Sequence, residues 1–136
     1  MDAEVIARLE GHGIQPSAHR VAVAEYVLHT EEHPSADEVW AKVGKRLLIS
    51  RATIYNTLNL LAEKGLIRAL TLAGGRVVFD PKLDRHHHFI DEETGAIHDV
   101  PWEAVRVSDI EALGARGYDV REYQVVMRGR RRQRRR

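Results

Sequence analysis

The segment that decides the fold is residues 50–79, SRATIYNTLNLLAEKGLIRALTLAGGRVVF. Three apolar residues in its first half recur at the spacing of a helix face: Ile54, Leu58 and Leu61. Ser50 is a favoured helix N-cap and Gly65 a favoured C-terminal stop, which predicts a helix over residues 51–64. The hydrophobic period then shortens, and the Gly-Gly pair fits the turn of a β-hairpin within residues 66–79.

Three more helices are predicted before this segment. An apolar stripe in residues 5–9 stops near Gly11. Pro16 suits the first turn of a second helix, whose apolar stripe consists of Val21, Ala24, Val27 and Leu28. Ser35 is a good N-cap for a third helix, whose predicted core residues are Val39, Trp40, Val43 and Leu47. Helices followed by a β-hairpin are the layout of a winged helix-turn-helix domain, which we assign to residues 1–80.

Residues 81–127 are predicted to form a smaller second domain. Strands are expected over 86–90 and 96–100, joined by a turn, with a helix over 103–115 and a last strand over 120–127. A segment of this size is too small for a sound hydrophobic core, so we expect it to dimerise. The predicted fold class is therefore α+β, with an N-terminal winged helix followed by a small α/β dimerisation domain.

The composition is that of a soluble globular protein, since 43% of the 136 residues are hydrophobic and 30% are charged. The sequence contains no cysteine, which excludes disulfides, thiol nucleophiles and thiolate zinc sites. No apolar run approaches the roughly 18 residues that span a bilayer. The acidic N-terminus is unlike a signal peptide, and we expect a cytoplasmic protein that does not contact a membrane.

Charge is distributed unevenly along the chain. Residues 1–80 hold 9 Lys or Arg against 10 Asp or Glu, residues 81–127 hold 5 against 10, and residues 128–136 hold 7 Arg and no acid. Because the first two segments are acidic, any surface there that binds nucleic acid must be a local patch. The Arg-rich tail, residues 128–136, is expected to be disordered and to bind phosphate.

The polar side of the helix over 51–64 carries groups suited to DNA. A helix in the major groove presents such groups from its N-terminal half, and the candidates there are Arg51, Thr53, Tyr55 and Asn56. Arg20, and Arg76 in the hairpin, are expected to contact phosphate. An ordinary solvated helix face fits the same pattern. The hairpin that follows favours DNA binding, and the predicted partner is double-stranded DNA.

Imidazoles and carboxylates cluster in the second half of the chain. Alternate residues of a strand share a face, so His86 and His88 project together while His87 points away. Asp99 lies on the strand predicted to pair with them. Such donors suit Fe(II), Mn(II) or Zn(II), although an exposed loop also explains three adjacent histidines. We expect His98 at the surface, with a pairing to His87 as the alternative.

Several blocks of the sequence together resemble the ferric uptake regulator (Fur) family of metal-dependent repressors. The resemblance extends from about Gly13 to Gly129. It is carried by GIQPSAHR at 13–20, HPSADEVW at 33–40, SRATIYNTL at 50–58, FD at 79–80, HHHF at 86–89 and IHDV at 97–100. It implies a homodimeric, non-enzymatic repressor that binds an inverted-repeat operator.

The resemblance also implies a regulatory metal site with five ligands: His33, Asp80, His86, His88 and Asp99. The first two belong to the winged-helix domain or hinge and the other three to the dimerisation domain. One metal would tie the two domains into one orientation, which would space two recognition helices across successive major grooves. The implied ion is Fe(II) or Mn(II) in function, and Zn(II) is possible in a purified sample.

Two departures from the family pattern affect the expected metals. Asp91 and Thr94 stand where the first cysteine pair of the family's structural zinc site would be, so no such zinc is expected. Four residues stand where the resemblance implies a second sensing site: Arg85, His87, Arg106 and Tyr123. Because two arginines cannot ligate a cation, we predict one metal per subunit.

The resemblance leaves more than one signal open. The aspartate at position 99 resembles the peroxide-sensing branch of the family. In that branch Fe(II) reacts with peroxide and a ligating histidine is oxidised. The histidine triplet without cysteines also resembles the iron response regulator branch, which senses haem. We favour a peroxide sensor, with iron, manganese or haem sensing as the alternatives within the family.

Two other functions compete with regulation by metal. Two histidines and a carboxylate are also the ligands of non-haem Fe(II) oxygenases, but a substrate pocket of that kind usually lies in a barrel that residues 81–127 do not provide. A winged-helix protein whose metal only stabilises the fold is the other possibility. In that case DNA affinity would not follow metal occupancy.

Overall fold

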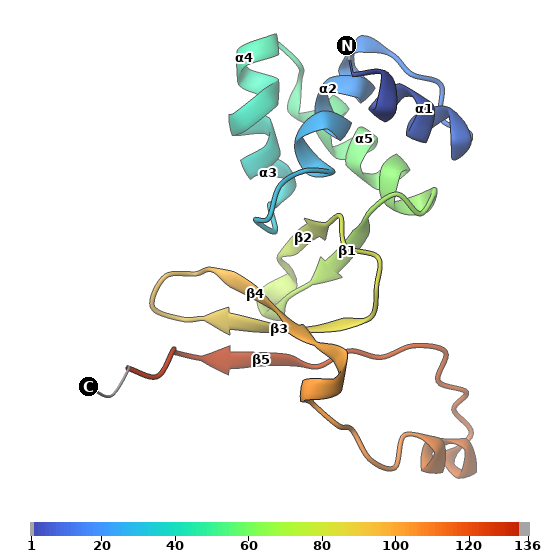
Figure 1. The fold of residues 1–136 in the computed structure, drawn as a ribbon, viewed down its shortest axis with the longest axis vertical. Coiled ribbons are helices and arrows are strands. Elements are labelled where there is room, and N and C mark those ends of the chain that lie inside the picture. Colours follow the sequence, from blue (N-terminus) through green and yellow to red (C-terminus); the bar gives the residue numbers. More distant parts are fainter. Residues whose placement is uncertain (1, 134–136) are drawn as a thin grey trace. The chain divides into compact units, whose positions relative to one another are not determined.

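The computed structural model describes residues 2–133 and has two compact units, Met1–Leu83 and Asp84–Arg136. The first unit consists of helices followed by a hairpin, and the second is built on a three-stranded sheet (Figure 1). The α+β class is thus confirmed. Within the described residues, no helix is both long enough and apolar enough to cross a membrane. Residues 134–136 of the expected disordered tail lie outside the described part.

Side-chain caps begin the helices of the first unit. The helices are α1 (Ala3–Gly11), α2 (Ala18–Val27), α3 (Ala36–Val39), α4 (Lys45–Leu47) and α5 (Arg51–Glu63). Ser35 and Glu38 form a reciprocal capping box at the start of α3. Ser50 caps α5 as predicted, and Gly65 follows that helix with a φ of 83°. Pro16 is not in the first turn of α2, because Ser17 takes the N-cap position by accepting the Arg20 N–H.

The third predicted helix contains a wider turn. α3 continues through a π-helical turn, Trp40–Gly44, into α4. A π turn closes over one more residue than an α turn, so the side chains that follow it are rotated away from the face set by α3. Leu47, which was expected in the core, is consequently 44% exposed.

Gly44 leaves room for the Trp40 indole in this turn. A β-carbon on Gly44 would lie 2.5 Å from Trp40 Cδ1, which is too close for any real contact. The Trp40 Nε1–H donates to the Ile49 carbonyl at 3.0 Å. The indole therefore connects the end of one helix to the turn that leads into α5.

The hairpin of the first unit is the predicted wing. Strands β1 (Arg68–Thr71) and β2 (Val77–Asp80) pair antiparallel, with Arg68 opposite Asp80. Gly74 and Gly75 both have positive φ, 83° and 84°, as the tight connection requires. The Phe79 N–H donates to the Pro34 carbonyl at 2.9 Å, which joins β2 to the segment before α3.

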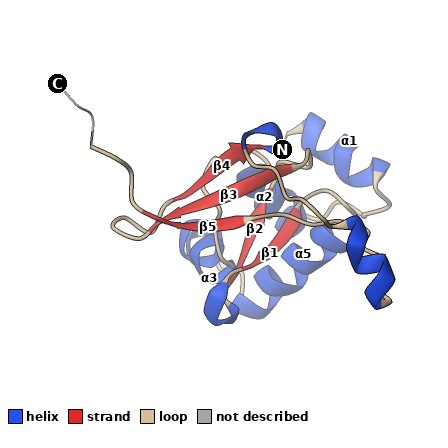
Figure 2. Ribbon diagram, turned by 90° about the horizontal axis from the view of Figure 1, so that it is seen from below, coloured by secondary structure: helices blue, strands red, loops and turns tan. Residues whose placement is uncertain are grey.

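The second unit is a three-stranded sheet in the order β4-β3-β5 (Figure 2). Its strands are β3 (His86–Asp91), β4 (Ile97–Pro101) and β5 (Val126–Gly129). β3 pairs antiparallel with β4 and parallel with β5. The last strand thus begins later than expected, and Arg128 and Gly129 belong to it rather than to a disordered tail.

The helix predicted over 103–115 is wrong. The segment between β4 and β5 contains two short 3-10 turns, Trp102–Ala104 and Glu111–Arg116, and Asp109 between them has a φ of 64°. The three residues expected to face inward are only half-buried: Val105, Ile110 and Leu113. An amphipathic helix draws most of its stability from a buried apolar face, which this segment lacks.

The hydrophobic core belongs to the first unit. It includes Ile54, Leu58 and Leu61 of α5, each 0% exposed, together with apolar residues of α1, α2, α3 and the wing. Among the described residues of the second unit, no hydrophobic side chain is buried, and those of its strands are half-buried: Phe89, Ile90, Ile97, Val100, Val126 and Met127. The buried side chains of β3 are instead polar: His86, His87, His88 and Asp91.

Replacing Gly44 with alanine is expected to destabilise the protein by about 1–3 kcal/mol, because the new methyl group overpacks the Trp40 ring. Gly11→Ala is the matched control, since a β-carbon there meets nothing within 4 Å and alanine is the better helix former. Urea unfolding followed by circular dichroism measures both. Equal stabilities of the two variants would contradict the role assigned to Gly44.

Candidate functional site

The residues proposed to contact bases lie on the first two turns of α5. Arg51, Tyr55 and Asn56 are exposed. Thr53 is half-buried, and its hydroxyl oxygen accepts a hydrogen bond from the Ser50 hydroxyl at 2.9 Å. Three of the four side chains are thus accessible to a ligand, while Thr53 is partly engaged in the helix cap.

Two surface grooves of the first unit collect five of the six predicted DNA-binding residues. One groove, of about 480 Å³, brings Arg20 of α2 together with Thr53 and Asn56 of α5. The other, of about 530 Å³, brings Tyr55 of α5 together with Arg76 of the wing. The helix therefore borders a groove on two sides, and each groove includes one of the arginines expected to bind phosphate.

All three arginines also have partners inside the first unit. Arg20 Nη1 donates to the Gln15 carbonyl at 3.0 Å. Arg51 Nη1 lies 3.1 Å from Asp37 Oδ1, and Arg76 Nη2 lies 2.6 Å from Glu38 Oε1. The sequence analysis did not predict the pairing of Asp37 with Arg51 or of Glu38 with Arg76, because the members of each pair are far apart along the chain.

The Glu38 carboxylate is shared between the helix cap and the wing. Its Oε1 accepts the Ser35 N–H at 3.1 Å as well as the Arg76 guanidinium. Partial burial raises the pKa of Glu38, but hydrogen bonds from Ser35 and Arg76, together with the Arg76 charge, outweigh this effect. They hold the pKa of Glu38 below its usual value, so the carboxylate is ionised at neutral pH.

The first unit contributes one pair of candidate metal ligands. His33 Nε2 lies 3.2 Å from Asp80 Oδ2, and both side chains are buried. Asp80 ends β2, and its Oδ1 also accepts the Lys82 N–H at 2.9 Å. His33 precedes Pro34, whose carbonyl is bonded to β2, so the wing sets the position of both members of the pair.

The second unit contributes three candidate ligands on one face of the β3–β4 hairpin. His86 Nε2 and His88 Nε2 lie 3.4 Å and 3.7 Å from Asp99 Oδ1, and the two rings are 4.6 Å apart. His86 Nδ1 is hydrogen-bonded to the Asp84 carbonyl. Because a carbonyl only accepts, Nδ1 is the donor in this hydrogen bond, and Nε2 is the ring nitrogen that faces Asp99.

His87 lies on the opposite face and has a structural role that was not predicted. It is 0% exposed and stacks on Trp102 with ring centroids 4.5 Å apart. Its Nδ1 accepts the Val125 N–H at 3.0 Å, and its Nε2–H donates to the Trp102 carbonyl at 3.2 Å. The alternative pairing with His98 is wrong, since His98 is half-buried beside Phe89, at 6.5 Å between ring centroids.

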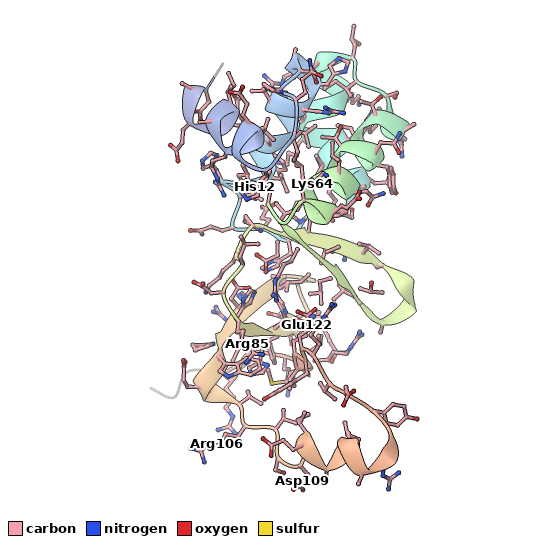
Figure 3. The ribbon with its side chains drawn as sticks, turned by 90° about the vertical axis from the view of Figure 1, so that its right-hand side faces the viewer. His12, Lys64, Arg85, Arg106, Asp109 and Glu122 are labelled. Carbon is pink, nitrogen blue, oxygen red and sulfur yellow. The ribbon has the colours of Figure 1, made fainter. Side chains whose placement is uncertain are left out.

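An aromatic cluster occupies the place expected for a second sensing site. The Arg85 guanidinium lies 5.0 Å from the centre of the Trp102 ring, and Tyr123 lies 4.9 Å from the same ring. Figure 3 shows Arg85 beside the sheet and Arg106 with Asp109 in the segment between β4 and β5. Three of the four residues at that place thus gather around Trp102: Arg85, His87 and Tyr123. The indole itself supplies no metal ligand.

Comparisons with known proteins agree on one family. The model of the Ferric uptake regulator family matches residues 11–128. The peroxide operon regulator of Bacillus subtilis (strain 168) is 31% identical over 129 residues, which cover 93% of this chain and 88% of that protein. The peroxide-responsive repressor PerR of Staphylococcus aureus (strain Mu50 / ATCC 700699) is 31% identical over 129 residues, covering 93% and 86%. The Vibrio cholerae ferric uptake regulator has the same fold, with a TM-score of 0.73 at 22% identity, covering 92% of this chain and 98% of that one.

Trp102→Ala is expected to lower the free energy of unfolding by about 2 kcal/mol, because it removes two aromatic contacts and one cation–π contact. Trp102→Phe keeps a ring face for His87 and Arg85 and should lose much less. Thermal unfolding followed by circular dichroism compares the variants. If both substitutions have the same effect, the cluster does not stabilise the second unit through ring stacking.

Proposed function

The chain belongs to the ferric uptake regulator family, and from this membership we propose that it is a homodimeric repressor whose binding to an inverted-repeat operator depends on a divalent metal. Proteins of this family are transcriptional regulators and not enzymes, which sets the oxygenase alternative aside. The observation that carries the proposal is that each unit holds its own converging set of imidazole and carboxylate groups.

Five side chains are the proposed ligands of one regulatory metal: His33, Asp80, His86, His88 and Asp99. In each unit an imidazole nitrogen already faces a carboxylate oxygen within 3.7 Å. Three nitrogens and at least two oxygens are a borderline donor set that fits Fe(II), Mn(II) or Zn(II). When bound, the metal supplies the positive charge that the two carboxylates neutralise.

The division of the ligands between two units supports a regulatory role. A ligand set that draws on both units favours one relative orientation of the units, and loss of the ion releases that preference. α5 belongs to the same unit as His33 and Asp80. The orientation of the units therefore governs the spacing of the two recognition helices in a dimer, which must match the half-sites of the operator.

The proposed stoichiometry is one metal per subunit. Both ring nitrogens of His87 are engaged with the backbone, and Arg85 is a cation that repels a metal. The chain has no cysteine for a structural zinc. Fe(II) or Mn(II) is the proposed physiological ion, and Zn(II) fits the same donors in a purified sample.

Dimerisation through the second unit is supported by its lack of a core. The half-buried apolar side chains of its strands need a further surface to leave water, and an identical unit related by a two-fold axis provides one. The β4 and β5 strands are the two outer strands of this sheet. A second copy is thus the proposed partner, in addition to double-stranded DNA.

Peroxide is the proposed signal. The two relatives described above are named as peroxide regulators at 31% identity over most of their length. Because the chain has no cysteine, oxidation at a thiol is unavailable. The oxidisable groups at the proposed site are the imidazoles of His33, His86 and His88.

His86→Ala, Asp99→Ala and His33→Ala are each expected to weaken metal-dependent DNA binding by about 100-fold or more, because even groups that only orient ligands contribute 10–100-fold. The fold should remain intact. His98→Ala is the control, since it removes an imidazole from the same hairpin outside the set. The measurement is fluorescence anisotropy of a duplex that the Mn(II)-loaded wild-type protein selects from a random pool.

Normal affinity in His86→Ala would show that the assigned site is not the regulatory one. If Mn(II) leaves the DNA affinity of the wild-type protein unchanged while raising its melting temperature, the metal only stabilises the fold.

Peroxide treatment of the Fe(II)-loaded protein is expected to add one oxygen, about 16 Da, to one of the three ligand histidines and to release DNA. An oxidised imidazole is a poorer electron-pair donor to a metal, so the two units should lose the metal ion that is proposed to link them. Protein loaded with Mn(II) should be protected. Peptide mass spectrometry and anisotropy measure the two effects. Unmodified histidines with full DNA affinity would favour iron or haem as the signal.

A further inference from the structure

Two arginines expected to contact DNA are held by neighbouring acids at the start of α3. Asp37 pairs with Arg51 of α5, and Glu38 pairs with Arg76 of the wing, at 3.1 Å and 2.6 Å. All four side chains are between 51% and 60% exposed. The N-terminal turn of one short helix thus places two carboxylates on the same surface as the proposed DNA contacts.

The Arg51 side chain has a defined direction. Its guanidinium lies 4.2 Å from the centre of the Trp40 ring, and the Trp40 indole is itself fixed by its hydrogen bond to the Ile49 carbonyl. Asp37 holds the guanidinium at its edge while Trp40 supports its face. This arrangement orients Arg51 at the N-terminus of α5, the part of a recognition helix that contacts base edges.

Glu38 restrains Arg76 in a similar way. Its carboxylate is fixed by the Ser35 N–H in the capping box, so the acceptor for Arg76 does not move with the wing. The lowered pKa of Glu38 keeps that acceptor charged. Arg76 is therefore bound to the helix end rather than free to reach along the wing toward phosphate.

Exposed ion pairs contribute little to stability and are readily exchanged. A phosphate that approaches Arg51 or Arg76 must nevertheless displace a carboxylate and then lie beside its negative charge. Displacing the carboxylate costs free energy in a complex with any DNA. Binding to random sequence is weakened most, because it depends almost entirely on phosphate contacts. A specific site also gains base contacts from α5, for which an oriented Arg51 is an advantage.

We propose that Asp37 and Glu38 are specificity-determining residues that weaken binding to random-sequence DNA by holding Arg51 and Arg76 in internal ion pairs. The inference rests on the proposed function, because it concerns the same DNA-binding surface. It gives the acids a role beyond starting α3. It also accounts for the placement of two carboxylates on a surface that binds a polyanion.

The test is the double variant Asp37→Asn, Glu38→Gln in the full-length, Mn(II)-loaded protein. Glutamine is accepted in the capping box in place of glutamate, so α3 should form, which circular dichroism checks. The matched control is Glu10→Gln, Glu63→Gln, which changes the net charge equally at exposed positions on α1 and α5. The probes are a random-sequence duplex and the duplex selected by the wild-type protein.

Affinity of the double variant for random-sequence DNA should rise about tenfold, and its salt dependence should steepen by about 0.9 in log–log slope for each arginine that reaches a phosphate. Affinity for the selected duplex should rise less, so the ratio of specific to random binding falls. The control should change neither slope nor ratio.

An unchanged salt slope, or an effect equal to that of the control, would overturn the inference. A loss of affinity for the selected duplex alone would overturn it too, because the acids would then only position the arginines. Failure of the proposed function is a different result, in which the wild-type protein selects no duplex at all with Mn(II).

Discussion

Within residues 2–133, fully buried hydrophobic side chains lie only in the first unit, and the rest of the structure depends on this uneven distribution. Helices α1–α5 and the wing enclose apolar side chains that are almost fully removed from water. The second unit buries histidines and an aspartate instead: His86, His87, His88 and Asp91. Buried polar groups stabilise a fold only when their hydrogen-bonding partners are supplied. This is why we propose that the second unit is stabilised by a bound metal and by a second copy of the chain.

The alternation of a β-strand gives the three consecutive histidines two different tasks. His86 and His88 face Asp99 across the hairpin, while His87 turns to the other side and joins Trp102 to Val125. One side of the strand thus carries the proposed metal ligands, and the other side forms contacts within the second unit. A change at His87 would disturb β3 as a whole, including the two donors on its other face.

Local signals in the sequence were sufficient for the helices of the first unit and for the wing. Ser35, Ser50 and Gly65 act within one turn of their own position, so their effect does not depend on tertiary contacts. The spacing of Ile54, Leu58 and Leu61 identified the buried face of α5 for the same reason. The α+β class followed from the order of these elements.

Features that depend on distant residues were not predictable in this way. In the π turn the Trp40 indole packs beside Gly44 and donates to the Ile49 carbonyl beyond the helix, a contact that no helix propensity indicates. The predicted helix over 103–115 had suitable residues but no apolar surface to cover. In the site, the five proposed ligands came from the resemblance and from strand alternation, whereas the ion pairs of Arg51 and Arg76 join residues brought together only by the fold.

Because β5 pairs in parallel with β3, the second unit closes only when almost the whole chain is available. Val126 lies opposite His88. Closing the long loop between them costs conformational entropy before the strand pairing contributes any stabilising free energy. The first unit relies on short-range helical contacts and is complete by residue 83. During synthesis we therefore expect α5 to fold before the sheet of the second unit. A nascent or truncated chain would then present α5 without the sheet through which we propose that the protein dimerises.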